Sequence, residues 1–314
     1  MSDPLHRPDQ PDRPDPLHQP DRLDELAAAV ARHSDGLWSD SAVPRQVLVA
    51  IDEPIAPTDL LYEPMICFIA KGAKGATAGE RSWVTGRGEM FFNPLVLPVT
   101  AVFHEVPYRS TVLRLDGRVL TDLLLELDGA EPRTEPGPGG QITAPMTPEI
   151  VDAVTRWVRL LDNPDDIRPL AARFEAEILY RLLGSPLGPM LRRFTSADSG
   201  TARVRAAAAW IAAHYAEPLS VDTIAAVAHM STATLHRHFK TATGMSPLRF
   251  QKQLRLQEAR RQLVAGDTTA ALVAEAVGYV SATQFNREYR RVYGLPPATD
   301  AARVRGRLAG ARRS

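Results

Sequence analysis

Two segments of the chain, fifty residues apart, hold side chains that could read the edges of DNA bases. Around Arg237 and Arg287 the sequence repeats in register without a gap, so the two segments are copies of one unit. Arginine can donate two hydrogen bonds to guanine and asparagine can pair in the same way with adenine. The candidate DNA contacts are Thr232, Ala233, His236, Arg237 and Lys240 in the first copy, and Ala282, Thr283, Asn286, Arg287, Arg290 and Arg291 in the second.

Each copy has the pattern of a helix-turn-helix, in which a short Ala- and Val-rich helix precedes a turn and a second helix. Leu235 and Phe239 lie four residues apart on one stripe of the second helix, so that stripe packs and the polar stripe stays free for a partner. A pair of ordinary helical hairpins with solvated arginines is the alternative. We expect first helices over 221–229 and 270–277, and second helices from an N-cap at Ser231 to Gly244 and from Ser281 to Gly294.

Two such units joined by one long helix, over 247–265, resemble the DNA-binding domain of the AraC/XylS family of transcription regulators. The resemblance lies in MSTATLHRHFKTATGMSPLRFQKQLRLQEARRQL and VGYVSATQFNREYRRVYGLPP, and it spans Thr201 to about Arg305. It implies double-stranded DNA as a partner. The sequence departs from the family pattern at Val280, where a polar or acidic residue is common, and in the Ala-rich TTAALVAEAV.

The net charge of zero conceals an uneven distribution along the chain. Residues 201–314 hold 17 Lys and Arg against 7 Asp and Glu, and residues 1–200 carry the opposite excess of ten. A basic C-terminal module fits a polyanionic partner, whereas the acidic half does not. The single cysteine excludes an internal disulfide, and neither a membrane helix nor a signal peptide is evident, so we expect a cytoplasmic protein.

Between Pro44 and about Leu115 the apolar period shortens to two, which predicts short strands and a small antiparallel barrel. YEPMICFIAKGAK, NPLVLPVTAVFHEVPY and VLRLD resemble the cupin-like N-terminal sensor domain of one AraC-type subfamily. The predicted fold class is therefore α+β, with an N-terminal cupin-like β-barrel and helical pair followed by an all-α double helix-turn-helix. Alternate residues of a strand share a face, so the tentative effector pocket holds Met65, Cys67 and Ile69.

The barrel region offers little for catalysis. Metal-dependent cupin enzymes need several converging ligands, and this region holds His104 alone, so we expect neither a metal nor a cofactor. Cys67 is either a reactive trigger, since some sensors that this domain resembles respond to aldehydes and other reactive compounds, or an inert core residue, since no cation adjoins it in sequence.

Helical periodicity returns after a Gly- and Pro-rich loop. Thr147 and Pro148 predict a helix start, and a second helix over 168–183 places Leu170, Phe174, Ile178 and Leu182 on one stripe. The resemblance favours a homodimer formed through this pair, and packing within one chain is the alternative. We expect a disordered tail at 1–22, a sensor at 23–142, the helical pair at 143–194, a linker at 195–200, a DNA-binding domain at 201–305 and a basic tail at 306–314.

Together these features predict a sequence-specific DNA-binding transcription regulator, not an enzyme, that a small-molecule effector controls through its N-terminal domain. RNA polymerase is a further partner if the protein is an activator. The alternatives are an architectural or effector-independent DNA-binding protein and a cupin-type enzyme. A DNA-alkylation repair protein, which joins this helix module to several metal-binding cysteines, would need more than one Cys.

Overall fold

The computed structural model describes residues 21–127, 142–196, 200–266 and 268–311. The N-terminal half contains α1 (Arg22–His33), β1 (Ser39–Asp40), β2 (Gln46–Ile51), β3 (Thr58–Tyr62), β4 (Met65–Ala78), β5 (Arg81–Thr85), β6 (Glu89–Asn93), β7 (Leu97–Arg114), α2 (Gly117–Leu127), β8 (Thr143–Pro145), α3 (Pro148–Arg159), short 3-10 turns at Leu160–Asp162 and Pro164–Asp166, α4 (Ile167–Leu183) and α5 (Gly188–Thr195). The C-terminal half contains α6 (Gly200–Ala213), α7 (Val221–Val227), α8 (Thr232–Thr243), α9 (Pro247–Ala265), α10 (Ala270–Ala276), α11 (Ala282–Tyr293) and α12 (Pro297–Ala311).

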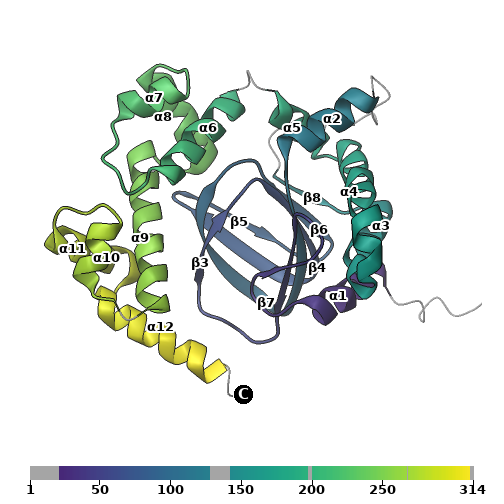
Figure 1. Ribbon diagram of the computed structural model, residues 1–314, viewed down its shortest axis with the longest axis horizontal. Helices are drawn as coiled ribbons and strands as arrows, with labels where there is room; N and C mark the ends of the chain where they lie inside the picture. Colours follow the sequence, from purple (N-terminus) through teal and green to yellow (C-terminus); the bar gives the residue numbers. More distant parts are fainter. Residues whose placement is uncertain (1–20, 128–141, 197–199, 267, 312–314) are drawn as a thin grey trace, which may run out of the picture.

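The predicted α+β fold class is confirmed, with one strongly curled antiparallel sheet at the centre of the molecule (Figure 1). Its strand order is β1-β2-β7-β4-β6-β8, with β3 on β7 and β5 on β4. The sheet does not close into a barrel, because edge strands β1 and β8 share no ladder. The long strands β4 and β7 bend where their register shifts, and Gly72 supports the bend with a φ of 76°, where an added Cβ would overlap the carbonyl oxygen of Glu105.

The two faces of the sheet are both buried, but against different partners. Ile66 and Phe68 point to one face, where they pack in a core with α1, α3 and α4. Helices α1, α3 and α4 flank that side of the sheet in Figure 1, and α6 to α12 lie on the other side. Met65, Cys67 and Ile69 point to the opposite face, which we call the inner face of the sheet. The core on this face continues into α6, α8 and α9.

The helical pair begins as predicted, since the Thr147 hydroxyl accepts from the backbone N–H of Ile150 and Pro148 is the first residue of α3. In α4, Ile178 and Leu182 are fully buried, whereas Leu170 and Phe174 are half-buried. All four side chains of the expected α4 stripe therefore pack within the chain, Leu170 and Phe174 at the margin of the core. Most of the predicted tail at 1–22 and part of the predicted linker at 195–200 lie outside the described residues.

The C-terminal half is all α-helical, and the long helix predicted over 247–265 is α9. The last helix, α12, continues to Ala311, beyond the residue at which we expected the DNA-binding domain to end. Arg303 is ion-paired with Asp300, and Arg305 donates to the carbonyl oxygen of Leu263. Arg303 and Arg305, which directly precede the predicted basic tail at 306–314, thus contact the rest of the domain.

Candidate nucleic-acid interface

The first helix-turn-helix consists of α7 and α8. The Ser231 hydroxyl caps α8 by accepting from the backbone N–H of Thr234, and Gly244 ends the helix in the left-handed conformation with φ 75°. Leu235 and Phe239 are fully buried, and the Phe239 ring packs edge-on against the ring of Phe250 in α9, with 5.3 Å between the two ring centres. The caps and the apolar stripe predicted for this copy are confirmed.

The second helix-turn-helix, α10 and α11, repeats these features. The Ser281 hydroxyl accepts from the backbone N–H of Gln284, and Gly294 ends α11 with φ 77°. Phe285 and Tyr289 are fully buried in a core that this unit shares with α9 and α12. Val280, which departs from the family pattern, is fully exposed in the turn before α11.

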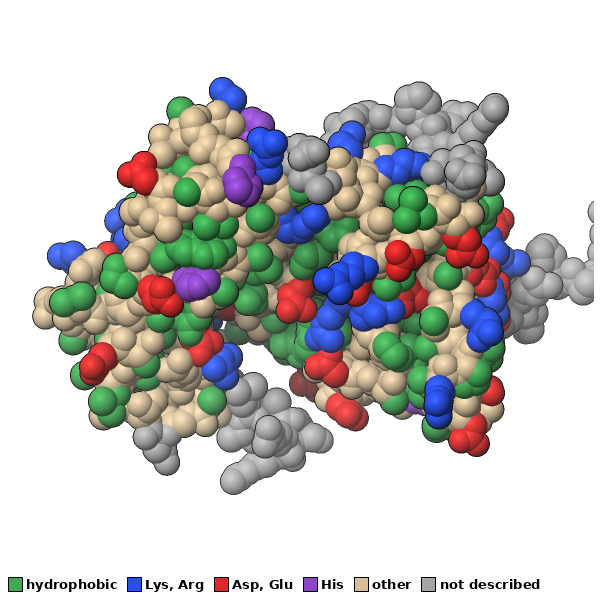
Figure 2. Space-filling model, turned by 45° about the horizontal axis from the view of Figure 1, so that its top comes forward, with side chains coloured by type: hydrophobic (Ala, Val, Ile, Leu, Met, Phe, Trp, Pro, Cys, Tyr) green, Lys and Arg blue, Asp and Glu red, His purple; other side chains and the backbone are tan. Residues whose placement is uncertain are grey.

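All of the candidate base- and phosphate-contacting side chains are exposed on the polar faces of α8 and α11. These residues are Thr232, Ala233, His236, Arg237 and Lys240 of α8, and Ala282, Thr283, Asn286, Arg287, Arg290 and Arg291 of α11. Figure 2 shows basic and histidine side chains gathered at the top of the molecule, over α7 and α8. The N-terminal residues of each helix are small, so the backbone can approach a groove closely while the longer cations reach outward.

One side chain of α9 that the sequence analysis did not single out holds the two units together. The Arg255 guanidinium donates to the carbonyl oxygens of Tyr215, at 2.6 Å, and of Gly278, at 2.9 Å. Tyr215 follows α6, which packs on the first unit, and Gly278 lies in the turn of the second. An added Cβ at Gly278 would overlap the carbonyl oxygen of Ala216, so the two segments touch directly. Arg255 thus links the segment after α6 to the second unit.

The turn between β4 and β5, residues 78–81, docks on the C-terminal end of α8. The backbone N–H of Glu80 donates to the carbonyl oxygen of Gly244 at 3.2 Å, and Arg81 donates to the carbonyl oxygen of Ala242. An added Cβ at Gly79 would overlap the carbonyl oxygen of Gly244. The Glu80 carboxylate also pairs with the Lys240 ammonium at 3.1 Å. A side chain that we expect to contact DNA phosphate is thus already ion-paired with an acidic residue of the sheet half.

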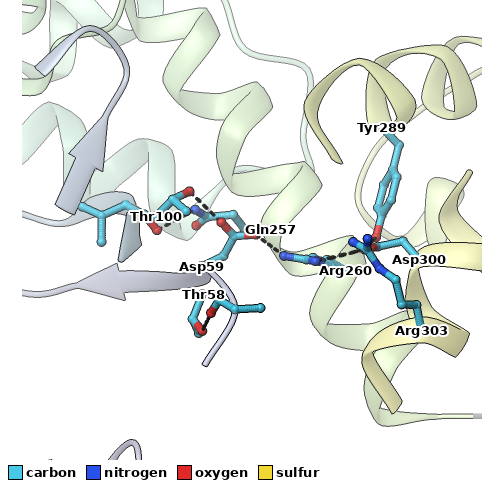
Figure 3. A network of polar contacts seen from close by, with 10 residues as sticks. Thr58, Asp59, Thr100, Gln257, Arg260, Tyr289, Asp300 and Arg303 are labelled. Carbon is cyan, nitrogen blue, oxygen red and sulfur yellow. Dashed lines mark hydrogen bonds and ion pairs between the residues drawn. The ribbon is translucent and has the colours of Figure 1, made fainter. Parts of the chain in front are cut away.

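A second bridge joins the sheet to the second unit through Arg260 of α9 (Figure 3). Arg260 pairs with Asp59 of β3 at 3.0 Å and with the fully buried Asp300 of α12 at 2.8 Å. The Tyr289 hydroxyl of α11 also donates to Asp300, at 3.1 Å. Burial alone would lower the pKa of Arg260, but the hydrogen bonds and charges of Asp300 and Asp59 outweigh it and raise that pKa. Arg260 therefore stays protonated at neutral pH.

The residues of the tentative effector pocket share the inner face of β4, as the strand period predicts. Met65, Cys67 and Ile69 are buried at 1 % exposure or less. A cation does adjoin the thiol in space, since the Nζ of Lys74 lies 3.9 Å from the Cys67 Sγ, although Lys74 is seven residues away in sequence. His104 is exposed, and no three His, Cys, Asp or Glu side chains of the described ranges gather as a metal site would require.

Family models match both halves of the chain. The model described as the AraC-type transcriptional regulator N-terminus matches residues 42–190, and a helix-turn-helix domain model matches residues 224–303. The chain belongs to the AraC family. Among the helices that the structure describes, none is long and apolar enough to cross a membrane.

Curated relatives of this AraC-family chain are transcriptional regulators. RhaS of Pectobacterium carotovorum, a transcriptional activator, is 33 % identical over 106 residues, which are 33 % of this chain and 38 % of RhaS. YobQ of Bacillus subtilis, an uncharacterised regulator, is 35 % identical over 92 residues, 29 % of this chain and 38 % of YobQ. The chain thus covers about two fifths of the length of these relatives.

A solved structure of another protein is similar over most of the chain. A variant of apo ToxT from Vibrio cholerae superposes with a TM-score of 0.50 at 9 % identity, covering 84 % of this chain and 98 % of ToxT. At that identity the similarity concerns the fold alone.

Proposed function

We propose that this protein is a sequence-specific DNA-binding transcription regulator that a small-molecule effector controls through its N-terminal sheet domain. The observation that carries the proposal is the pair of capped helices α8 and α11, whose candidate contacts are exposed while their apolar stripes are buried. Because α9 and Arg255 hold both units, the two helices would enter successive major-groove segments about 10 base pairs apart.

Effector control, rather than effector-independent binding, is favoured by the contacts between the two halves of the chain. Glu80 pairs with Lys240 of the first unit, and Asp59 pairs with Arg260, which leads to the second unit. A ligand that changes the sheet domain would act through these contacts by its differential affinity for the docked and released arrangements.

The proposal requires no catalytic step, and it places the protein in the cytoplasm, where the chromosome lies. We assign residues 23–142 to the sensor, 143–194 to a helical pair that supports a homodimer, and 201–305 to the DNA-binding domain. Tyr180 of α4 is exposed, and Leu170 and Phe174, which pack against the core of their own chain, are exposed in part, so α4 leaves some apolar surface for a second copy. RNA polymerase would be a partner if the protein activates transcription, as the name of the RhaS relatives states for them.

Footprinting on genomic fragments followed by paired substitutions tests the proposal. Arg237→Ala should weaken one half of the footprint and Arg287→Ala the other, each by about 1 to 3 kcal/mol if the arginine grips guanine through two hydrogen bonds. The same loss at every base position in both variants would mean that these arginines contact phosphate only. Absence of any protected fragment for the wild-type protein would contradict the function itself.

A further inference from the structure

The inner face of the sheet buries a cluster of polar side chains that the DNA-binding function does not use. Lys74 is 7 % exposed, and Cys67 and Tyr108 are completely buried. The Lys74 Nζ lies 3.9 Å from the Cys67 Sγ, and the Tyr108 hydroxyl lies 3.9 Å from the same sulfur. Tyr62 and Ser110 complete this cluster, which we call the Lys74 site, and both are completely buried.

The Lys74 ammonium donates to the Cys67 sulfur, a weak acceptor, and to no carboxylate of the described residues. The Tyr62 hydroxyl, beside Lys74, and the Ser110 hydroxyl, beside Tyr108, lack a well-aligned hydrogen-bond partner among the described residues. No Asp or Glu of the described ranges pairs with Lys74. The ammonium lies 5.2 Å from the centre of the Tyr62 ring and 5.8 Å from that of Tyr108, contacts that offset only part of the loss of hydration.

Other buried charges of the chain have an oppositely charged partner, which Lys74 lacks among the described carboxylates. Glu175 is 3 % exposed and is held by Arg45, and Asp300 is held by Arg260. Burying a charge without an opposite charge costs several kcal/mol, so a lysine in this position calls for an anionic partner. Burial raises the pKa values of Tyr62 and Tyr108, so both hydroxyls remain protonated donors at neutral pH.

The side chains beside the Lys74 site are small or apolar. Ala76 of β4 pairs in register with Ala101 of β7, and both side chains belong to the inner core, as do Ile69 and Phe103. A ligand held here would thus have an anionic group among the donors and an apolar body of few atoms.

We propose that the Lys74 site binds the carboxylate of a small organic acid, with the Lys74 ammonium as its counter-ion and the hydroxyls of Tyr62 and Ser110 as further donors. A neutral ligand would leave the ammonium unpaired, and a cation would be repelled by it. The inference rests on the proposed function insofar as this acid would be the effector of the sheet domain.

Thermal unfolding of the full-length protein tests the Lys74 site. The probes are acetate, propionate and butyrate, each compared with its amide at the same ionic strength in chloride. A carboxylate that binds only the folded state raises the unfolding midpoint in proportion to the logarithm of its concentration above Kd, so we expect a rise of a few degrees with the acids and none with the amides. Lys74→Met should abolish the rise, and Lys71→Met, which removes an exposed lysine of the same strand, should keep it.

Tyr62→Phe keeps the ring and removes its hydroxyl, so it should fold and weaken the response to the acids several-fold.

Two results would overturn the inference. They are a wild-type midpoint that no acid raises above chloride, and a response that Lys74→Met retains. A retained response would place the carboxylate elsewhere, for example in the cavity that Arg81, Trp83 and Arg237 line between the sheet and α8. Footprinting of the same preparations separates this failure from a failure of the proposed function, because loss of the Lys74 site leaves DNA binding intact.

Discussion

The glycines that end the two recognition helices should respond very differently to the same substitution. Gly244 and Gly294 have matching left-handed conformations, with φ of 75° and 77°. Alanine at either position costs about 1 to 2 kcal/mol in backbone strain. An added Cβ at Gly294 meets nothing within 4 Å, whereas at Gly244 it overlaps the carbonyl oxygen of Ala78 in the docked turn. Overlap of this kind adds about 1 to 3 kcal/mol.

Gly244→Ala should therefore lower the free energy of unfolding by about 2 to 5 kcal/mol, and Gly294→Ala by about 1 to 2 kcal/mol. Urea unfolding of the full-length chain measures both. Gly79→Ala disrupts the same contact from the side of the turn. The Gly79→Ala/Gly244→Ala double variant should therefore lose about 1 to 3 kcal/mol less free energy of unfolding than the sum of the two single variants. The losses of Gly79→Ala and Gly294→Ala should simply add in their double variant. Equal losses for Gly244→Ala and Gly294→Ala would refute the docking of the 78–81 turn on α8.

Two further predictions concern the ion pairs between the halves. Glu80→Gln should free Lys240 to contact a DNA phosphate, so DNA affinity should rise at low salt and the slope of its salt dependence should steepen by about one unit. Glu105→Gln, which changes another exposed acidic residue of the sheet, should alter neither quantity. Filter-binding titrations over a salt series measure both. Asp300→Ala should lower the free energy of unfolding by about 3 to 5 kcal/mol at pH 7, because it leaves Arg260 half-paired. Burial alone would raise the pKa of Asp300, but Arg260 outweighs it and lowers that pKa below its ordinary 3.8. The stability lost in Asp300→Ala should therefore persist down to about pH 4 and shrink as the pH falls through the lowered pKa. A stability difference between wild type and Asp300→Ala that already vanishes at about pH 6 would contradict this explanation.

The local features of the C-terminal half could be predicted because they are encoded in short stretches. Ser231 and Ser281 cap their helices, and Leu235 and Phe239 face the core, since caps and a four-residue period depend on near neighbours in the chain. The strand alternation placed Cys67 on the inner face in the same way. The role of the exposed candidate residues in contacting DNA remains a prediction.

Contacts between residues that are distant in the sequence could not be predicted from caps and periodicity. Lys74 lies seven residues from Cys67, and only the bend at Gly72 brings it back toward the thiol, so sequence spacing gave no sign of the cation. The same holds for Gly79, whose contact at Gly244 is far along the chain. The open edges of the sheet were equally hidden, because alternation specifies a face and not whether the first and last strands meet.

The Arg255 bridge has a consequence for the shape of the operator. One guanidinium ties the segment after α6 to the turn before α11, and Gly278 lets the two backbones touch. In the proposed complex the protein therefore cannot lengthen or twist to suit a different spacing of half-sites. A change of one base pair between them must be absorbed by bending or untwisting the duplex, so flexible pyrimidine–purine steps in the spacer should strengthen binding without being touched by any side chain.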